Sequence, residues 1–294
     1  MPPLLNAEHL ARLAGLQLRV NSVVEGTLTG LHRSPHHGGS IEFAEHKEYA
    51  PGDDLRHLDW KALGKFDRYY IKRFEDETDL KAYLLLDASG SMGYGRPLTK
   101  LQYASTLLAS LAVILLRQGD QPALLGYSDG VRTYLPPRSR NSHAMEMVRV
   151  IEELTPEGGT DVARAVEHLS EVMARRSLVV LVSDLFDGGD SGLGTVRHLR
   201  ARGHHVVLFH LFHPDELEFP FTQLTNFQGM EEQREVLVDP GGIRRAYHKE
   251  MDRFRRRVRL ACQEGEVEYH QITTAEPLDR VLLHFLRRAR GRGA

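Results

Sequence analysis

The chain has 294 residues, of which 41% are hydrophobic and 27% are charged, and its formal net charge is −2. Such a composition indicates a globular protein with a sizeable core, arranged as one large domain or two modest ones. The single cysteine, Cys262, excludes an intramolecular disulfide framework. The near-neutral net charge argues against a protein whose whole surface binds nucleic acid. We therefore expect no nucleic-acid partner.

The first residues lack the basic start and long apolar region of a signal peptide. The most apolar stretch, residues 107–116, is about half as long as a membrane span requires. These two features predict a cytoplasmic protein that is not inserted in a membrane.

Charge is unevenly distributed along the chain. Residues 242–262 carry a net +6 and residues 287–294 carry +4, which leaves −12 for the remainder. The basic segment coincides with a predicted helix, and we expect its charges to form a solvated face. An acidic protein partner is the alternative for this helix.

Residues 1–80 predict a small, β-rich N-terminal module. A short amphipathic segment at 7–16 precedes a loop at 27–39 that is rich in glycine and histidine. Pro51-Gly52 is a turn signal, because proline presets φ and glycine accepts positive φ. Residues 69–74 favour a strand.

From residue 81 to residue 294, apolar runs typical of buried strands alternate with helical patterns. Strands are expected at 82–86, 122–127, 131–135, 178–182, 205–212 and 267–272, and helices at 99–117, 142–154, 161–174, 194–202, 242–264 and from 277. Such alternation predicts an α/β domain, with a doubly wound, mostly parallel sheet flanked by helices.

Two acidic residues directly follow buried apolar runs. Asp87 ends the run at 82–86, and the run at 178–182 ends in Ser183-Asp184, so both acids should lie at the carboxyl edge of the sheet, where α/β proteins bind ligands. Positions 87, 89 and 91 of an extended segment point the same way, which adds the hydroxyls of Ser89 and Ser91. Thr160, in a Gly-Gly-Thr loop, offers a third hydroxyl. These hard oxygen ligands suit Mg²⁺, Mn²⁺ or Ca²⁺.

This pattern resembles the metal-ion-dependent adhesion site of von Willebrand factor A domains. The matching positions are Asp87, Ser89, Ser91, Thr160 and Asp184. The resemblance implies a von Willebrand factor A-like fold in which the hydroxyls touch the metal and the acids act partly through water. An acidic side chain of a protein partner would complete the coordination, and the cation would neutralise Asp87 and Asp184.

A longer resemblance links the chain to the bacterial domain-of-unknown-function fifty-eight family, of the soluble type. It rests on the segment Tyr49–Trp60, on Leu237-Val238-Asp239-Pro240, on Tyr247 and on the closing Pro277-Leu278. Members of that family are commonly encoded beside AAA+ ATPases of the MoxR kind, which implies a role in the assembly or maturation of partner proteins. Acidic, basic and aromatic residues of Tyr49–Trp60 either pin the N-terminal module or form a contact surface.

Other readings of the same residues are enzymatic or structural. A haloacid-dehalogenase type phosphatase needs a second aspartate where Ser89 stands, so its general acid is absent. Ser128 lies in a Gly-x-Ser-x-Gly pattern, but a strand follows it instead of the helix of a hydrolase elbow. We expect a non-enzymatic, metal-dependent protein-interaction module. A metal-dependent hydrolase and an adaptor with a vestigial metal site are the alternatives.

Overall fold

The computed structural model describes residues 7–32, 46–48, 70–72, 80–174, 176–186, 189–231 and 234–292. The chain divides into two compact units, one made of Met1–Leu31 together with Leu80–Ala294 and the other of His32–Asp79. In the second unit, β1 (His46–Glu48) pairs antiparallel with β2 (Tyr70–Lys72). The segment Tyr49–Trp60 lies outside the described residues.

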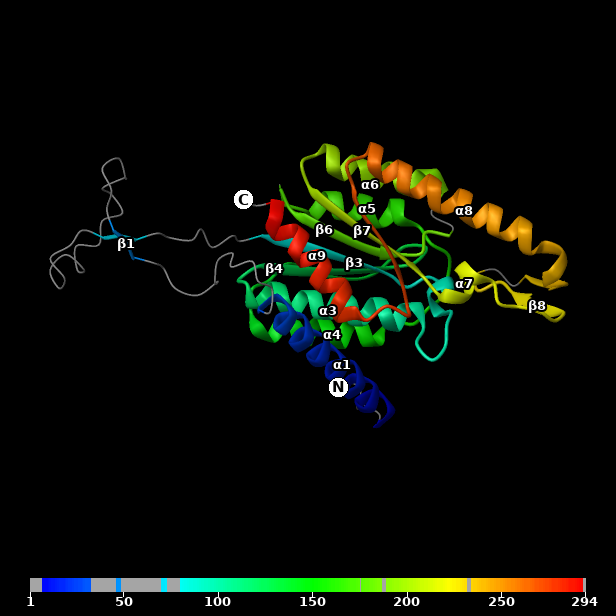
Figure 1. Ribbon diagram of the computed structural model, residues 1–294. Helices are drawn as coiled ribbons and strands as arrows, with labels where there is room; N and C mark the ends of the chain where they lie inside the picture. The colour runs from blue at the N-terminus through cyan, green and yellow to red at the C-terminus, as the bar shows by residue number, and fades with distance from the viewer. Residues whose placement is uncertain are drawn as a thin grey trace. The chain divides into compact units, whose positions relative to one another are not determined.

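The first unit is built on a six-stranded sheet with the order β10-β7-β6-β3-β4-β5 (Figure 1). Its strands are β3 (Lys81–Asp87), β4 (Gln121–Tyr127), β5 (Val131–Leu135), β6 (Leu178–Ser183), β7 (His205–Phe212) and β10 (Glu268–Thr273). All neighbouring strands are parallel except β4 and β5, which form an antiparallel hairpin at one edge. The predicted α/β class with a mostly parallel sheet is confirmed.

Helices cover both faces of this sheet. They are α1 (Ala7–His32), α3 (Lys100–Arg117), α4 (Asn141–Glu153), α5 (Val162–Val172), α6 (Gly189–Ala201), α8 (Pro240–Glu264) and α9 (Leu278–Arg292). Apolar side chains of α1, α3, α4 and α9 form one core cluster with the sheet, and those of α5, α6 and α8 form the other. Burial on both faces explains why the central strands are continuous apolar runs rather than alternating ones.

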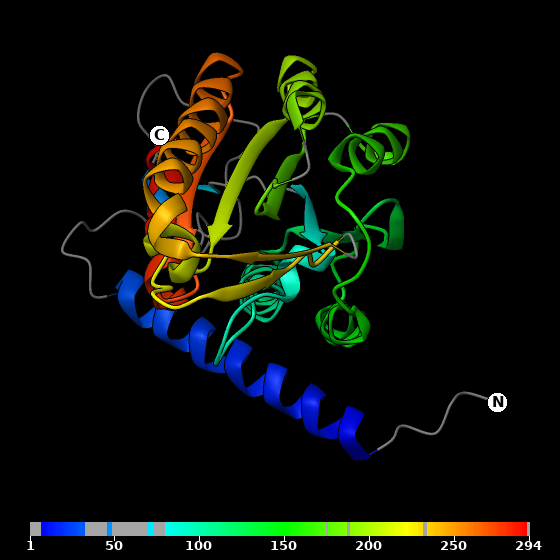
Figure 2. The same cartoon turned by 90° about the vertical axis from the view of Figure 1, so that its right-hand side faces the viewer.

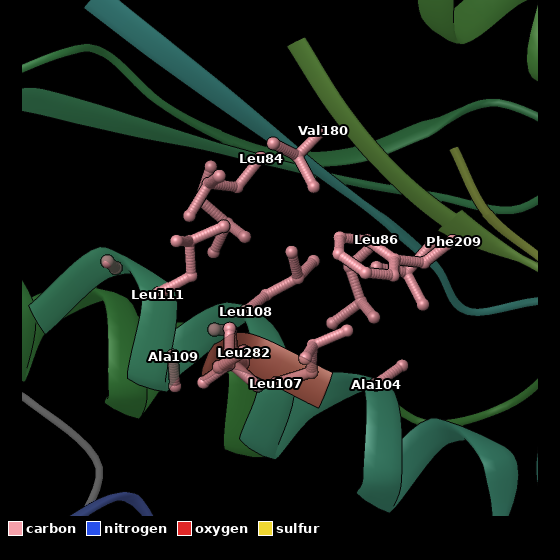
Figure 3. Packing of buried hydrophobic residues seen from close by; sticks show 14 of the residues in the cluster. Leu84, Leu86, Ala104, Leu107, Leu108, Ala109, Leu111, Val180, Phe209 and Leu282 are labelled. Carbon is pink, nitrogen blue, oxygen red and sulfur yellow. The ribbon is translucent and has the colours of Figure 1, made fainter. Parts of the chain in front are cut away.

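Alternation along β3 divides its side chains between the two clusters. Leu84 and Leu86 belong to the cluster under α3, whereas Tyr83 and Leu85 face α5 and α6. Figure 3 shows Leu84 and Leu86 beside Val180 and Phe209 of neighbouring strands, with leucines of α3 and Leu282 of α9 below them. Among the described residues, no helix is both long enough and apolar enough to cross a membrane.

The first helix differs from the sequence expectation in both length and place. Residues 7–16 were expected to form a short segment of a module spanning 1–80, but α1 has 26 residues and its unit is the α/β one. Leu16, Val20 and Val24 recur at helical spacing and are buried in the core. Arg287 of α9 also donates a hydrogen bond to the Gly30 carbonyl, 3.1 Å away. The α/β unit thus includes an N-terminal helix that the predicted boundary at residue 80 had excluded.

The segment between β7 and α8 was not foreseen from the sequence. It holds a short helix, α7 (Pro214–Glu218), and a two-stranded antiparallel hairpin of β8 (Thr225–Gln228) and β9 (Glu235–Val238). Figure 2 shows this hairpin running from the start of α8 across the carboxyl edge of the central sheet. The hairpin therefore reaches the edge at which the candidate site lies.

Candidate metal site at the carboxyl edge of the sheet

Asp87 is the last residue of β3 and is completely buried. Its Oδ1 accepts a hydrogen bond of 2.9 Å from the Ser89 backbone N–H, and its Oδ2 accepts one of 2.5 Å from the Ser183 hydroxyl at the end of β6. Burial and the nearby charge of Asp184 raise the pKa of Asp87 to about 6, although the two hydrogen bonds act in the opposite direction. Asp87 is thus a fixed carboxylate beneath the loop that follows β3.

Two loops meet above Asp87. The Gly90 N–H donates to the Gly158 carbonyl at 2.9 Å, and the Glu157 N–H donates to the Ala88 carbonyl at 3.0 Å. These backbone bonds hold the loop after β3, with its short 3₁₀ turn η2 (Gly90–Gly93), beside the loop that leads into α5. These loop-to-loop hydrogen bonds bring the Asp-x-Ser-x-Ser and Gly-Gly-Thr segments to one place.

The three predicted hydroxyl residues lie around a common point. Ser89 Oγ and Ser91 Oγ are 3.2 Å apart. The Ser91 N–H and the Thr160 hydroxyl both donate long hydrogen bonds, each 3.4 Å, to the same oxygen, Oε1 of Glu231. Glu231 follows β8 in the hairpin, so a residue 140 positions after Ser91 takes part in the site. No spacing in the sequence had pointed to it.

Asp184 is also at this edge and is completely buried, but its carboxylate is already paired. The Lys100 ammonium lies 2.6 Å from Asp184 Oδ2 and 2.5 Å from Glu216 Oε1 of α7. Burial alone would lower the pKa of Lys100, yet the two carboxylates outweigh burial and raise it. Lys100 thus already gives Asp184 a positive partner, and the neutralisation of Asp184 by a bound cation stays a prediction. The sequence feature that could have indicated this pair is Lys100 itself, a lysine at the first position of the largely apolar helix α3.

Ser128 and Asp161 are two further polar residues of the loops beside the site. Ser128 lies in the turn between β4 and β5, which pair antiparallel, so no helix follows it and the hydrolase elbow is excluded. Asp161 is the N-cap of α5, where its side chain accepts a 3.0 Å hydrogen bond from the Arg164 N–H. Asp161 therefore has a structural part, as the cap of α5.

Comparison with known protein families identifies the family of this chain. The family model described as "Protein of unknown function DUF58" matches residues 45–257, which is more than half of the sequence. The chain belongs to this family. The uncharacterized protein Mb1516 of Mycobacterium bovis is 28% identical over 236 residues, which make up 78% of this chain and 74% of that relative. The uncharacterized protein Rv1480 of Mycobacterium tuberculosis matches to the same extent.

Solved structures similar to this DUF58 protein include two from other bacteria. The conserved hypothetical protein BatB of Bacteroides thetaiotaomicron superposes with a TM-score of 0.47 at 13% identity, over 71% of this chain and 98% of BatB. The vWF domain of the type V pili tip protein Mfa5 of Porphyromonas gingivalis superposes with a TM-score of 0.31 at 21% identity, over 36% of this chain and 37% of that one.

The donor set of this DUF58 protein fits a hard divalent cation. It combines the hydroxyls of Ser89, Ser91 and Thr160 with the carboxylates of Asp87 and Glu231, all of them oxygen donors. In the described part of the chain, no group of three or more histidine, cysteine, aspartate or glutamate side chains is placed to hold a metal. A cation here would therefore depend on hydroxyl ligands, which suits Mg²⁺, Mn²⁺ or Ca²⁺ better than zinc.

Proposed function

We propose that this protein is a non-enzymatic, divalent-metal-dependent protein-interaction module. The observation that carries the proposal is that the Ser91 N–H and the Thr160 hydroxyl, from separate loops, both donate to Glu231 Oε1, while the hydroxyls of Ser89 and Ser91 lie 3.2 Å apart. A bound cation would sit among the Thr160 hydroxyl, the paired hydroxyls of Ser89 and Ser91 and this carboxylate. The site would use Mg²⁺, with Mn²⁺ or Ca²⁺ as substitutes.

Each residue has a distinct part in such a site. Ser89, Ser91 and Thr160 would be direct neutral ligands, whereas buried Asp87 would act from beneath, held by Ser89 and Ser183. Asp184 would contribute through water, because Lys100 occupies one of its carboxylate oxygens. A cation held mainly by neutral hydroxyls keeps net positive charge and therefore attracts a carboxylate of a protein partner.

The partner we propose is an AAA+ ATPase of the MoxR kind, or a client of that ATPase, in the cytoplasm. This part rests on the resemblance to the soluble members of the family. The chain itself has no Walker A sequence, so ATP hydrolysis would belong to the partner. The expected role is the assembly or maturation of other proteins rather than a reaction on a small molecule.

Calorimetric titration of the full chain with Mg²⁺ and Mn²⁺ tests the metal site. We expect saturable binding that Ser91→Ala and Thr160→Val each weaken by about tenfold. Ser170→Ala is the matched control, since that hydroxyl bonds only to the Val166 carbonyl within α5. Saturable binding that is unchanged in both site variants, or no binding by the unaltered chain, would overturn the proposal.

The Lys100–Asp184 pair favours one second candidate, an adaptor that works without a metal. In that case an internal ammonium already supplies the positive charge of the site. Co-purification with a purified MoxR-type ATPase, with and without a chelator, separates the two candidates. Complex formation lost in the chelator supports the metal-dependent module, and complex formation indifferent to it supports the adaptor.

A further inference from the structure

The β8–β9 hairpin places a carboxylate of the chain itself in the candidate metal site. Glu231 Oε1 accepts from the Ser91 N–H and from the Thr160 hydroxyl, so it lies between the two loops that carry the hydroxyl ligands. A carboxylate at this point is the chemical group that the proposed function assigns to a protein partner. Glu231 therefore occupies the position for which an outside acidic side chain would compete.

Glycines in the loop after β3 and in the loop before α5 allow the hairpin to approach both loops closely. A Cβ atom built on Gly90 would lie 2.1 Å from the Met230 carbonyl oxygen, a separation that real Cβ atoms do not show. A Cβ on Gly159, in the other loop, would lie 3.7 Å from Glu231 Oε2. Glycine at position 90 thus lets the hairpin backbone rest directly on the loop after β3, with the Glu231 side chain turned toward the hydroxyls.

The base of the hairpin is held firmly, and its strands are exposed. Arg244 of α8 donates to the carbonyls of Phe219 and Phe221 at 2.7 and 2.6 Å, which anchors the chain between α7 and β8. The two strands have only four residues each, and five of these eight residues are exposed. An element with a fixed base and few buried contacts can open locally at low cost in free energy.

We propose that Glu231 is an internal ligand that caps the metal site, so that a partner's carboxylate must displace the hairpin to bind. The inference rests on the proposed function, because it concerns the same site. A ligand carried on a hairpin whose base is fixed has a high effective concentration, so it competes well with an outside carboxylate. The cap would restrict binding to partners that also engage the displaced hairpin or its exposed apolar side chains, such as Leu237.

Water proton relaxation of the Mn²⁺-loaded full chain tests the cap directly. Mn²⁺ relaxes the water molecules bound to it, so the signal reports how many coordination positions water occupies. In Glu231→Gln we expect Mn²⁺ affinity to fall by about tenfold and the relaxivity of the bound ion to rise, because water replaces the lost carboxylate. Sodium acetate should then lower that relaxivity at concentrations that leave the unaltered chain unaffected.

Glu157→Gln is the matched control. It removes the same charge close to the site, but its carboxylate pairs with Arg132 and does not face the hydroxyls. Unaltered Mn²⁺ affinity and relaxivity are expected for it. If Glu231→Gln has the same Mn²⁺ affinity and relaxivity as Glu157→Gln, and the unaltered chain binds Mn²⁺, then the proposal that Glu231 caps the site is wrong while the metal site itself is supported. If the unaltered chain binds no Mn²⁺, the metal site itself is overturned.

Discussion

Lys100 Nζ lies 2.6 Å from Asp184 Oδ2, and both side chains are completely buried. The same ammonium contacts Glu216 of α7, so one cation joins the start of α3, the end of β6 and the segment that leads to the hairpin. A buried charge is tolerated only when it is paired and hydrogen-bonded. The pair therefore organises the carboxyl edge of the sheet whether or not a metal is bound.

Replacing Lys100 with methionine should destabilise the fold strongly. The variant Lys100→Met leaves two carboxylates without their shared cation, and we expect it to lower the free energy of unfolding by about 3–5 kcal/mol. Urea denaturation measures the change. Lys249→Met, at an exposed position on α8, is the control and should stay within about 0.5 kcal/mol of the unaltered chain. A loss of less than about 1 kcal/mol in Lys100→Met would contradict this account of the pair.

Metal affinity should depend on pH through Asp87. Its pKa is raised from 3.8 to about 6 in the metal-free fold, and a cation favours the ionised carboxylate. Above about pH 6 the group is already ionised and affinity should be constant, whereas below that value affinity should fall by about tenfold per pH unit. Calorimetric Mn²⁺ titrations between about pH 5 and 8 measure the profile. A Mn²⁺ affinity that does not change with pH over this range would show that the ionisation of Asp87 is not coupled to metal binding.

The raised pKa of Asp87 also predicts how the stability of the metal-free protein depends on pH, and this dependence has the opposite sign to that of metal affinity. Because the folded protein holds the Asp87 proton more tightly than the unfolded chain does, this group makes the fold less stable as pH rises from about 4 to 6. Asp87→Asn should remove that part of the pH dependence in metal-free protein, measured by thermal unfolding in the presence of a chelator. An unchanged slope in the variant would show that other groups cause it.

A methyl group at position 90 should separate the hairpin from the site. In Gly90→Ala the added Cβ meets the Met230 carbonyl, which is backbone and cannot simply rotate away. We expect a loss of stability of about 1–3 kcal/mol and faster hydrogen exchange of residues 225–228 and 235–238. Gly130→Ala is the control, since no heavy atom lies within 4 Å of its Cβ position. Equal exchange of the hairpin in both variants would rule out the close contact.

Helix α3 should depend on its first-turn cap. The Thr99 hydroxyl accepts from the Gln102 N–H at 3.2 Å, and the Gln102 side chain accepts from the Thr99 N–H, which forms a complete capping box. Thr99→Ala should lower the free energy of unfolding by about 1 kcal/mol. Ser142→Ala, on the exposed start of α4, provides the comparison by urea denaturation and should have a smaller effect.

Much of the fold could be predicted because its signals are local. Buried apolar runs ended at Asp87 and just before Asp184, and the structure places both residues at the same edge of the sheet. The turn at Ser128–Gly130 joins β4 and β5, the two strands expected on either side of it. Each of these features depends on residues a few positions apart, whose periodicity or turn chemistry is visible in the chain.

The sequence by itself determined the alternating strands and helices of the central sheet, and with them the place of Asp87, Ser89 and Ser91 at its carboxyl edge. Parallel strands must present their carboxyl ends at one edge, so the residues that end β3 and follow β6 lie at the same edge, whereas loop packing brings Thr160 to it. Only the tertiary structure decided that Lys100 pairs with Asp184, that α1 joins the α/β unit and that Glu231 enters the site. Glu231 reaches Ser91 across 140 residues of chain, and no local pattern encodes a contact made by packing one element over another.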